Sequence, residues 1–285
     1  MPEQDSSAAS AHASISDRLG IQIPIAVDGA YRDNADLREY LDAALTHRLS
    51  VVELNIVDYE AVQPAGLLQF LQDFNLRLQN LATGGMAVRR AHALAHPDSD
   101  RRADAIATIR RAIAFSAEAA AHSGQPTPGI ILGLVQGKSD APKEQQRALF
   151  ASALEELLPA AADAGVALIV EATNRYLSGV SHTVEESVEF ALQLDSPFIR
   201  VLPDTFHMNI EERDICAELI RHREFIDELH VSENNRFYPG FGALDFRHIG
   251  GCFEAAGFSG PYVIEGNLNT DVSSSLATAV AALTR

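Results

Sequence analysis

The amino-acid sequence predicts an α/β protein of the (β/α)8 TIM-barrel class, and three observations lead to that prediction. Short apolar runs alternate with stretches of helical periodicity, which favours a parallel sheet. Eight such strand–helix units follow one another, which is the number that closes a barrel. The length of 285 residues suits one barrel, because this fold uses about 250 residues. We therefore expect a flexible tail over residues 1–17 and a single TIM-barrel domain over residues 18–285.

Each expected strand is a short apolar run bounded by turn-forming or charged residues. The expected strands span residues 19–27, 50–57, 81–88, 129–135, 166–172, 197–204, 227–233 and 261–267. The expected helices span residues 33–49, 64–79, 101–124, 143–165, 183–195, 215–226, 245–258 and 273–285. An open doubly wound sheet is the rival fold, but it normally has fewer strands, and no GxGxxG motif follows the first strand here.

Residues with capping preferences mark several helix starts. Asp33 or Asn34 can cap the first helix, and Pro64 lies in the first turn of the second. Thr183 and Glu186 have the spacing of a capping box.

Glycines mark the ends of the two longest helices. Gly124 and Gly165 are their last residues, as expected for residues that end a helix in a left-handed conformation.

Composition and charge narrow the classes of partner. The formal net charge is −17, which argues against a nucleic-acid backbone as ligand. No apolar run approaches the roughly 18–20 residues that span a bilayer, and the first residues contain no apolar signal-peptide core. Cys216 and Cys252 are the two cysteines, and neither belongs to a CxxC pair. We expect no disulfide framework and a cytoplasmic location.

Four residues with ligand-type side chains lie at the exits of the last four expected strands. They are Glu171, Asp204, His230 and Glu265. Chemistry in a TIM barrel occurs at the carboxyl ends of the strands, so these side chains share one mouth. A single glutamate at a strand end is more often solvated or salt-bridged, and a single histidine in a strand is more often a core residue. The joint pattern favours a divalent cation, and oxygen and imidazole ligands suit Mn²⁺, Mg²⁺ or Co²⁺.

Four longer stretches resemble one family. EATNRY (171–176), PDTFHMNIEE (203–212), ELHVSENNRFYPGFGALDF (228–246) and YVIEG (262–266) resemble the xylose-isomerase-like barrel superfamily. Within it they look most like the D-tagatose/D-psicose 3-epimerase and 5-keto-gluconate epimerase group, over about residues 19–266.

The resemblance implies a site and an activity. It implies that the four strand-end residues bind one divalent ion, with Mn²⁺ expected first and Mg²⁺ or Co²⁺ as alternatives. It also implies that Glu171 and Glu265 are the catalytic acid/base pair of a keto-sugar or keto-sugar-acid epimerase or isomerase. His207 and Arg236 match positions that hold substrate oxygens. Without the family match, His207 is equally well a structural loop residue, and Arg236 is better explained as a surface ion pair.

The expected reaction moves a proton on carbon next to a carbonyl, through an enediolate. A divalent ion acidifies that C–H bond, one carboxylate removes the proton, and a second returns it on the opposite face. His207 would donate a hydrogen bond to the oxygen that becomes anionic. Arg236 would hold a hydroxyl or carboxylate of the substrate.

Departures from the group point to an altered substrate. Leu177 stands where ketose 3-epimerases carry a second acid, which makes the pocket more apolar. Arg89 and Arg90 make the exit of the third strand basic, where related enzymes are more acidic. The two arginines would receive an anionic substrate, although solvated surface charge explains them slightly better.

Three other functions compete with the epimerase. A metal-dependent lyase acting by dehydration, decarboxylation or cleavage of a 3-oxo-glycoside would use the same site. A DNA repair endonuclease would need more metal ligands and a basic surface. A non-catalytic barrel would have lost a strand-end ligand. We expect a carbohydrate substrate and neither nucleic acid nor membrane as partner, and the sequence leaves a homo-oligomer open.

Overall fold

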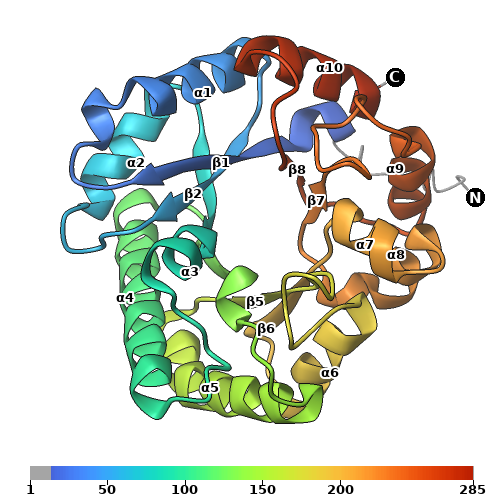
Figure 1. Cartoon of the computed structure of the whole chain (residues 1–285). Coiled ribbons are helices and arrows are strands. Elements are labelled where there is room, and N and C mark those ends of the chain that lie inside the picture. The colour runs from blue at the N-terminus through green and yellow to red at the C-terminus, as the bar shows by residue number, and fades with distance from the viewer. Residues whose placement is uncertain (1–13, 285) are drawn as a thin grey trace, which may run out of the picture.

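A computed structural model of the chain describes residues 14–284. Eight parallel strands form one sheet that curves around a central axis, and helices surround it (Figure 1). Neighbouring strands follow the order β6-β5-β4-β3-β2-β1-β8-β7. The strands are β1 (Leu19–Val27), β2 (Val51–Ile56), β3 (Arg77–Ala82), β4 (Gly129–Leu132), β5 (Leu168–Glu171), β6 (Ile199–Leu202), β7 (Leu229–Val231) and β8 (Tyr262–Ile264). The predicted (β/α)8 barrel is confirmed.

Short contacts join the two outer strands of this sheet. Val201 of β6 forms an isolated parallel bridge with Ile226, and Asp204 forms another with His230 of β7. The His230 backbone N–H donates to the Pro203 carbonyl at 3.0 Å. These contacts nearly close the barrel, and they bring two of the predicted ligands into register.

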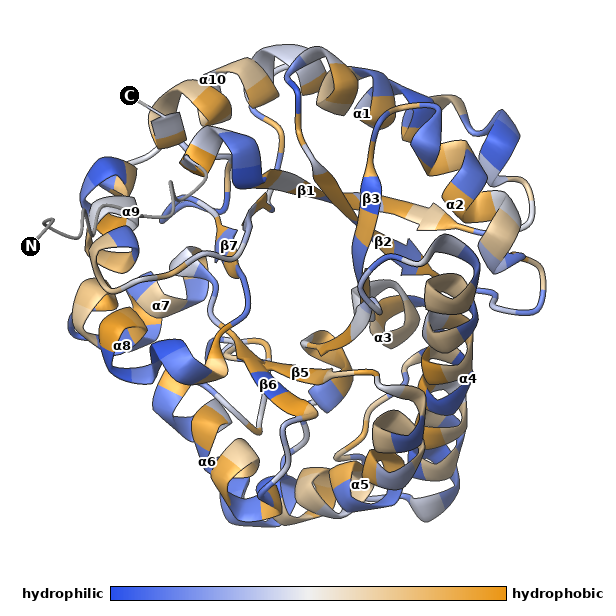
Figure 2. Ribbon diagram, turned by 180° about the vertical axis from the view of Figure 1, so that it is seen from behind, coloured by the Kyte–Doolittle hydropathy of each residue, from blue (hydrophilic) through white to orange (hydrophobic). Residues whose placement is uncertain are grey.

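Helices cover the outside of the barrel. They are α1 (Ala35–Thr46), α2 (Pro64–Gln72), α3 (Gly84–Arg90), α4 (Ser99–Ser123), α5 (Lys143–Ala164), α6 (Val184–Leu194), α7 (Thr205–Glu211), α8 (Ile215–His222), α9 (Phe246–Ala255) and α10 (Val272–Thr284). In α4, Ile106, Ile109 and Ile113 recur every three or four residues and are all buried, so one stripe of the helix faces the sheet. Figure 2 shows hydrophobic residues on the strands and a mixture of hydrophobic and hydrophilic residues on the helices.

The third unit differs from the prediction. The helix expected over residues 64–79 ends at Gln72, and β3 begins at Arg77, four residues before the expected strand. Asn75 has a φ of 55°, a left-handed conformation that asparagine tolerates and that ends a helix. Residues 84–88, expected in the strand, belong to α3 (Gly84–Arg90) instead. The residues of β3 pair with β2, and this pairing sets the boundary between the helix and the strand. Local periodicity cannot reveal a pairing with another strand.

The predicted caps are found with one exception. Asn34 accepts a hydrogen bond from the Leu37 N–H at 3.0 Å and caps α1. Thr183 accepts from the Glu186 N–H, but the Glu186 carboxylate binds the His182 N–H rather than completing a capping box.

The glycine caps of the two long helices are confirmed. Gly124 and Gly165 have φ values of 61° and 66°, so both end their helices in the left-handed conformation.

The start of the chain is described in part. Residues 1–13 of the predicted tail lie outside the described residues, and Ile15–Arg18 form a short 3₁₀ helix. The Arg18 guanidinium donates to the Gly260 carbonyl at 2.7 Å, which ties this turn to the loop before β8. The division into a tail and a domain stays a prediction. Over residues 14–284, no helix has the length and apolar character needed to cross a membrane.

Candidate functional site

The four predicted ligands meet at the carboxyl end of the barrel. Glu171 ends β5, Asp204 follows β6, His230 lies in β7 and Glu265 follows β8. One ligand atom from each side chain lies within 4.8 Å of all the others. Asp204 and His230 are fully buried, and Glu171 is 8% exposed. The fold therefore brings together three carboxylates and one imidazole that are spread over 95 residues of sequence.

The arrangement fits a divalent cation. Nδ1 of His230 lies 2.8 Å from Oε2 of Glu265. Asp204 accepts the Phe206 N–H at 2.7 Å through Oδ1, which fixes the direction of Oδ2. Oxygen and imidazole donors without thiolate are the set that Mn²⁺, Mg²⁺ and Co²⁺ use in proteins.

Two cationic groups of the protein balance the carboxylates. The Arg236 guanidinium contacts Oδ2 of Asp204 and lies 2.8 Å from Oε1 of Glu265. Burial alone would lower the pKa of His230, but Glu53 and Glu265 raise it well above its ordinary value.

The two predicted acid/base residues have opposite electrostatic surroundings. Burial, and next the charge of Glu265, raise the pKa of Glu171 to about 8. Burial would also raise the pKa of Glu265, but Arg236 and His230 outweigh it and hold that pKa below its usual range. In the metal-free protein one carboxyl therefore holds a proton near neutral pH while the other is ionised. Paired carboxyl groups with such different affinities are typical of acid/base sites.

His207 presents one defined ring nitrogen to the site. The Asn174 side-chain N–H donates to Nδ1 of His207 at 2.8 Å, so Nδ1 accepts and Nε2 carries the proton. Nε2 lies 3.8 Å from Oε1 of Glu171 and 3.9 Å from Oδ2 of Asp204. Burial lowers the pKa of His207, which favours the neutral ring. The side chain can therefore donate a hydrogen bond toward the four-residue cluster.

The loop after β7 holds Arg236 in a strained conformation. Its φ of 66° is left-handed, which costs a non-glycine residue of the order of 1 kcal/mol or more. The Asn267 N–H donates to the Arg236 carbonyl at 2.7 Å, and Phe237 bridges to Asn267. The loop after β8 thus fixes the backbone that directs this guanidinium into the mouth.

Three buried polar residues beneath the mouth were not predicted. Oε2 of Glu53 in β2 lies 2.8 Å from Nε2 of His230. The Asn80 side-chain amide in β3 donates to Glu53 at 3.0 Å and to Glu228 at 2.5 Å. The signal available in the sequence is the presence of polar residues inside otherwise apolar strands, as in VVELNI and RLQNLA.

The two carboxyl groups of this buried cluster, Glu53 and Glu228, differ in their protonation. Burial, and next the charge of Glu53, raise the pKa of Glu228 well above its ordinary value. Burial also acts on Glu53, but His230 outweighs it and lowers that pKa. Glu53 is therefore the anion of the pair, and Glu228 is the neutral acid.

A pocket opens above these groups. Its walls include Thr173, Leu177, Gly133, His207 and three of the four predicted ligands, Glu171, His230 and Glu265. Leu177 is 45% exposed and gives the pocket an apolar edge. A Cβ atom on Gly133 would collide with Oε2 of Glu171, so only glycine leaves room for this carboxylate.

The two adjacent arginines of α3 have different surroundings in the fold. Arg89 is exposed and lines the outer part of the mouth together with Arg236 and Glu265. Arg90 donates to the Val57 carbonyl at 2.7 Å and so supports the β2 exit.

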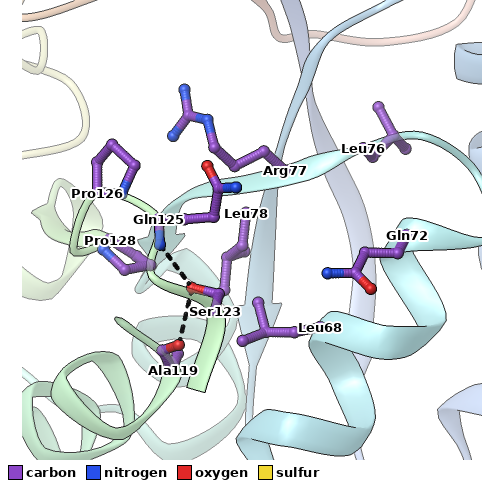
Figure 3. Close-up of a pocket in the computed structure, with 10 residues that line it drawn as sticks. All are labelled: Leu68, Gln72, Leu76, Arg77, Leu78, Ala119, Ser123, Gln125, Pro126 and Pro128. Carbon is purple, nitrogen blue, oxygen red and sulfur yellow. Dashed lines mark hydrogen bonds between the residues drawn. The ribbon is translucent and has the colours of Figure 1, made fainter. Parts of the chain in front are cut away.

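A second pocket lies between α2 and α4, near the start of β3 (Figure 3). Arg77 is the charged side chain among its lining residues, and it hydrogen-bonds to Gln79 at 2.6 Å. The Ser123 hydroxyl donates to the Ala119 carbonyl and accepts from the Gln125 N–H, as the dashed lines in Figure 3 mark. We assign no chemistry to this pocket, because its lining offers no acid/base pair or ligand set.

Comparison with known proteins gives one family and several relatives. A profile of the xylose isomerase-like TIM barrel family matches residues 41–282. D-psicose 3-epimerase of Enterocloster bolteae is 33% identical over 43% of this chain and 41% of its own length. 3-Dehydro-D-guloside 4-epimerase of Escherichia coli K12 is 28% identical over 44% of this chain and 48% of its own length. In both alignments this chain spans less than half of the relative.

Solved structures agree in fold over nearly the whole chain. D-psicose 3-epimerase of Clostridium cellulolyticum H10, solved with D-tagatose, has a TM-score of 0.73, 22% identity and coverage of 93% of this chain and 96% of its own. A 3-keto-D-glucoside 4-epimerase of E. coli has a TM-score of 0.71, 20% identity and coverage of 91% and 97%.

Proposed function

Because the chain belongs to the xylose isomerase-like TIM barrel family, we propose that it is a divalent-metal-dependent epimerase or isomerase of a keto-sugar or keto-sugar acid. One observation carries the proposal: Glu171, Asp204, His230 and Glu265 converge on one point at the mouth of the barrel. The names of the relatives, which are epimerases of psicose and of a 3-dehydro-guloside, support the same substrate class. Mn²⁺ is the ion we expect first.

The protein's own residues have the following roles. A bound divalent ion would acidify the C–H bond next to the substrate carbonyl. Glu171 and Glu265 exchange the proton at the reacting carbon, one on each face. His207 donates its Nε2–H to the oxygen on which negative charge develops, since Asn174 fixes that tautomer. Arg236 holds a second substrate oxygen and keeps Glu265 ionised.

The residues at the outer mouth of the barrel favour a keto-sugar acid as the substrate. Arg89 lines the same opening as Arg236 and Glu265, whereas Arg90 is held by Val57. A carboxylate at the far end of a keto-sugar acid would form a charge-assisted hydrogen bond with an exposed guanidinium. This observation favours a sugar acid over a neutral ketose.

The test is proton exchange in D₂O. Purified protein with Mn²⁺ is incubated with ketoses, keto-acids and 3-oxo-glycosides, and products are read by NMR. Deuterium on carbon next to the carbonyl, together with an epimer or isomer, is the expected result. Glu265→Gln should abolish exchange, and Glu189→Gln, an exposed residue paired with Arg147, should match the wild type.

The same experiment separates the epimerase from the alternative. Proton abstraction beside a carbonyl also begins an elimination or a cleavage. The apolar edge that Leu177 gives the pocket is compatible with such a lyase reaction. Elimination or cleavage products would move the enzyme to the lyases. Absence of exchange with every compound, although metal is bound, would contradict proton abstraction at this site.

A further inference from the structure

The chain carries a second group of metal-type side chains on its outer surface. Cys216 lies in the first turn of α8, and His248 and Cys252 lie four residues apart on α9. Residues at that spacing lie on the same face of a helix. One ligand atom from each of the three side chains lies within 4.8 Å of the other two. The only two cysteines of the sequence, 36 positions apart, are therefore brought to one point.

The three ligand atoms lie close enough to share one zinc ion after a turn of the His248 ring. Sγ of Cys252 lies 3.8 Å from Nδ1 and 3.7 Å from Nε2 of His248. With Zn–S bonds of about 2.3 Å and Zn–N bonds of about 2.0 Å, a tetrahedral ion separates sulfur from nitrogen by about 3.6 Å. Because the sulfur is nearly equidistant from the two ring nitrogens, the exposed His248 ring turns about its side-chain bonds before one nitrogen and the sulfur bind the same ion. Sγ of Cys216 approaches the same residue, 4.0 Å from the His248 carbonyl.

The surroundings suit a cation that arrives from solvent. His248 is exposed, and both cysteines are free and half-buried. Burial and, next, the neighbouring Cys252 raise the pKa of the Cys216 thiol to about 12. Asp214 and Asp245, which cap α8 and α9, contribute to this rise. A bound metal ion displaces the thiol proton. The helices belong to the outer ring (Figure 1), whereas the predicted catalytic residues lie at the strand exits. The two groups of ligands therefore do not share residues.

We propose that Cys216, His248 and Cys252 bind one Zn²⁺ ion, with water or a nearby carboxylate at the fourth position. Two thiolates and an imidazole select zinc over the Mn²⁺ or Mg²⁺ that suit the oxygen-rich mouth. The ion would join α8 to α9, the helices that flank β7 in sequence. The site does not depend on the proposed epimerase activity.

Cobalt substitution tests the proposal directly. Co²⁺ bound by thiolates gives an intense near-ultraviolet charge-transfer band that oxygen ligands do not produce. Under reducing conditions the wild type should show this band at one Co²⁺ per chain, and one equivalent of Zn²⁺ should remove it. Cys252→Ser and Cys216→Ser should lose the band, whereas Glu265→Gln should retain it. The melting temperature with Zn²⁺ at about 100 times its Kd should rise by roughly 5 °C in the wild type and not in Cys252→Ser.

Two results would overturn the site. A wild type without the charge-transfer band would show that the thiols do not bind the ion. A band that persists in Cys252→Ser would show that the ligands lie elsewhere. Because serine is nearly isosteric, the metal-free melting temperature of Cys252→Ser should equal that of the wild type, and a large fall would call for Cys252→Ala before the band is interpreted.

Discussion

Nε2 of His230 lies 2.8 Å from Oε2 of Glu53, a carboxylate buried in β2 beneath the mouth of the barrel. This contact leaves Nδ1 of His230 as the nitrogen that faces Glu265. A carboxylate behind a metal-binding histidine fixes the tautomer and makes the ring a better ligand. The pair therefore connects an unpredicted residue to the proposed metal site.

Glu53→Gln is expected to weaken Mn²⁺ binding. A neutral amide still accepts a hydrogen bond from His230 but no longer stabilises positive charge on the ring, and loss of such a partner costs about 10–100-fold in metal affinity. Calorimetric titration of Mn²⁺ into metal-free protein measures the change. Glu228→Gln is the matched control, because the raised pKa of Glu228 makes it neutral already. Equal losses in the two variants would contradict the assignment of charge to Glu53.

The stability of the metal-free protein should depend on the protonation of Glu171. Its folded-state pKa is about 8, against an ordinary value of 4.5. Between these values the folded protein holds a proton that the unfolded chain has released, so this group's stabilisation is lost as pH rises from about 4.5 to 8. The difference in melting temperature between the wild type and Glu171→Gln, measured with EDTA from pH 5 to pH 8.5, isolates this effect. The wild type should lose stability relative to the variant as pH rises, and parallel curves would refute the prediction.

Gly133→Ala should damage the site without removing any ligand. The added Cβ would occupy the space of Oε2 of Glu171, so the carboxylate must rotate away. A misplacement of about 1 Å at a reacting group costs roughly 10²-fold in rate. Deuterium exchange measures the loss, and Gly251→Ala, where a Cβ meets nothing within 4 Å, should stay within a factor of two. Full exchange activity in Gly133→Ala would show that Glu171 does not need its present position.

Arg89→Ala should discriminate between substrate classes. Loss of one exposed charge-assisted contact should raise KM for a keto-sugar acid about tenfold, ~1.4 kcal/mol, with kcat unchanged. KM for a neutral ketose should not change, and the difference should shrink at high salt. Arg111→Ala removes the same charge from α4, where Arg111 lies near Glu60, and should leave both values unaltered. Equal KM increases for both substrate types would argue against an anionic substrate.

The sequence by itself determined the order of the eight strand–helix units and, except for β3, the approximate position of each strand. Apolar runs and capping residues such as Asn34 and Gly124 act over a few neighbours, so their effect can be read locally. The strand-end residues Glu171, Asp204 and Glu265 could be proposed as neighbours because parallel strands of one barrel end at the same side.

The tertiary structure decided what depends on contacts between distant segments. Pairing with β2 ended the second helix at Gln72, although the periodicity continued beyond it. The burial of Glu53 beside His230, 177 positions away, and the meeting of Cys216 with Cys252 follow from barrel closure and helix packing. Such contacts leave no periodic signal, because each depends on where two remote segments are held in space and not on the residues beside them.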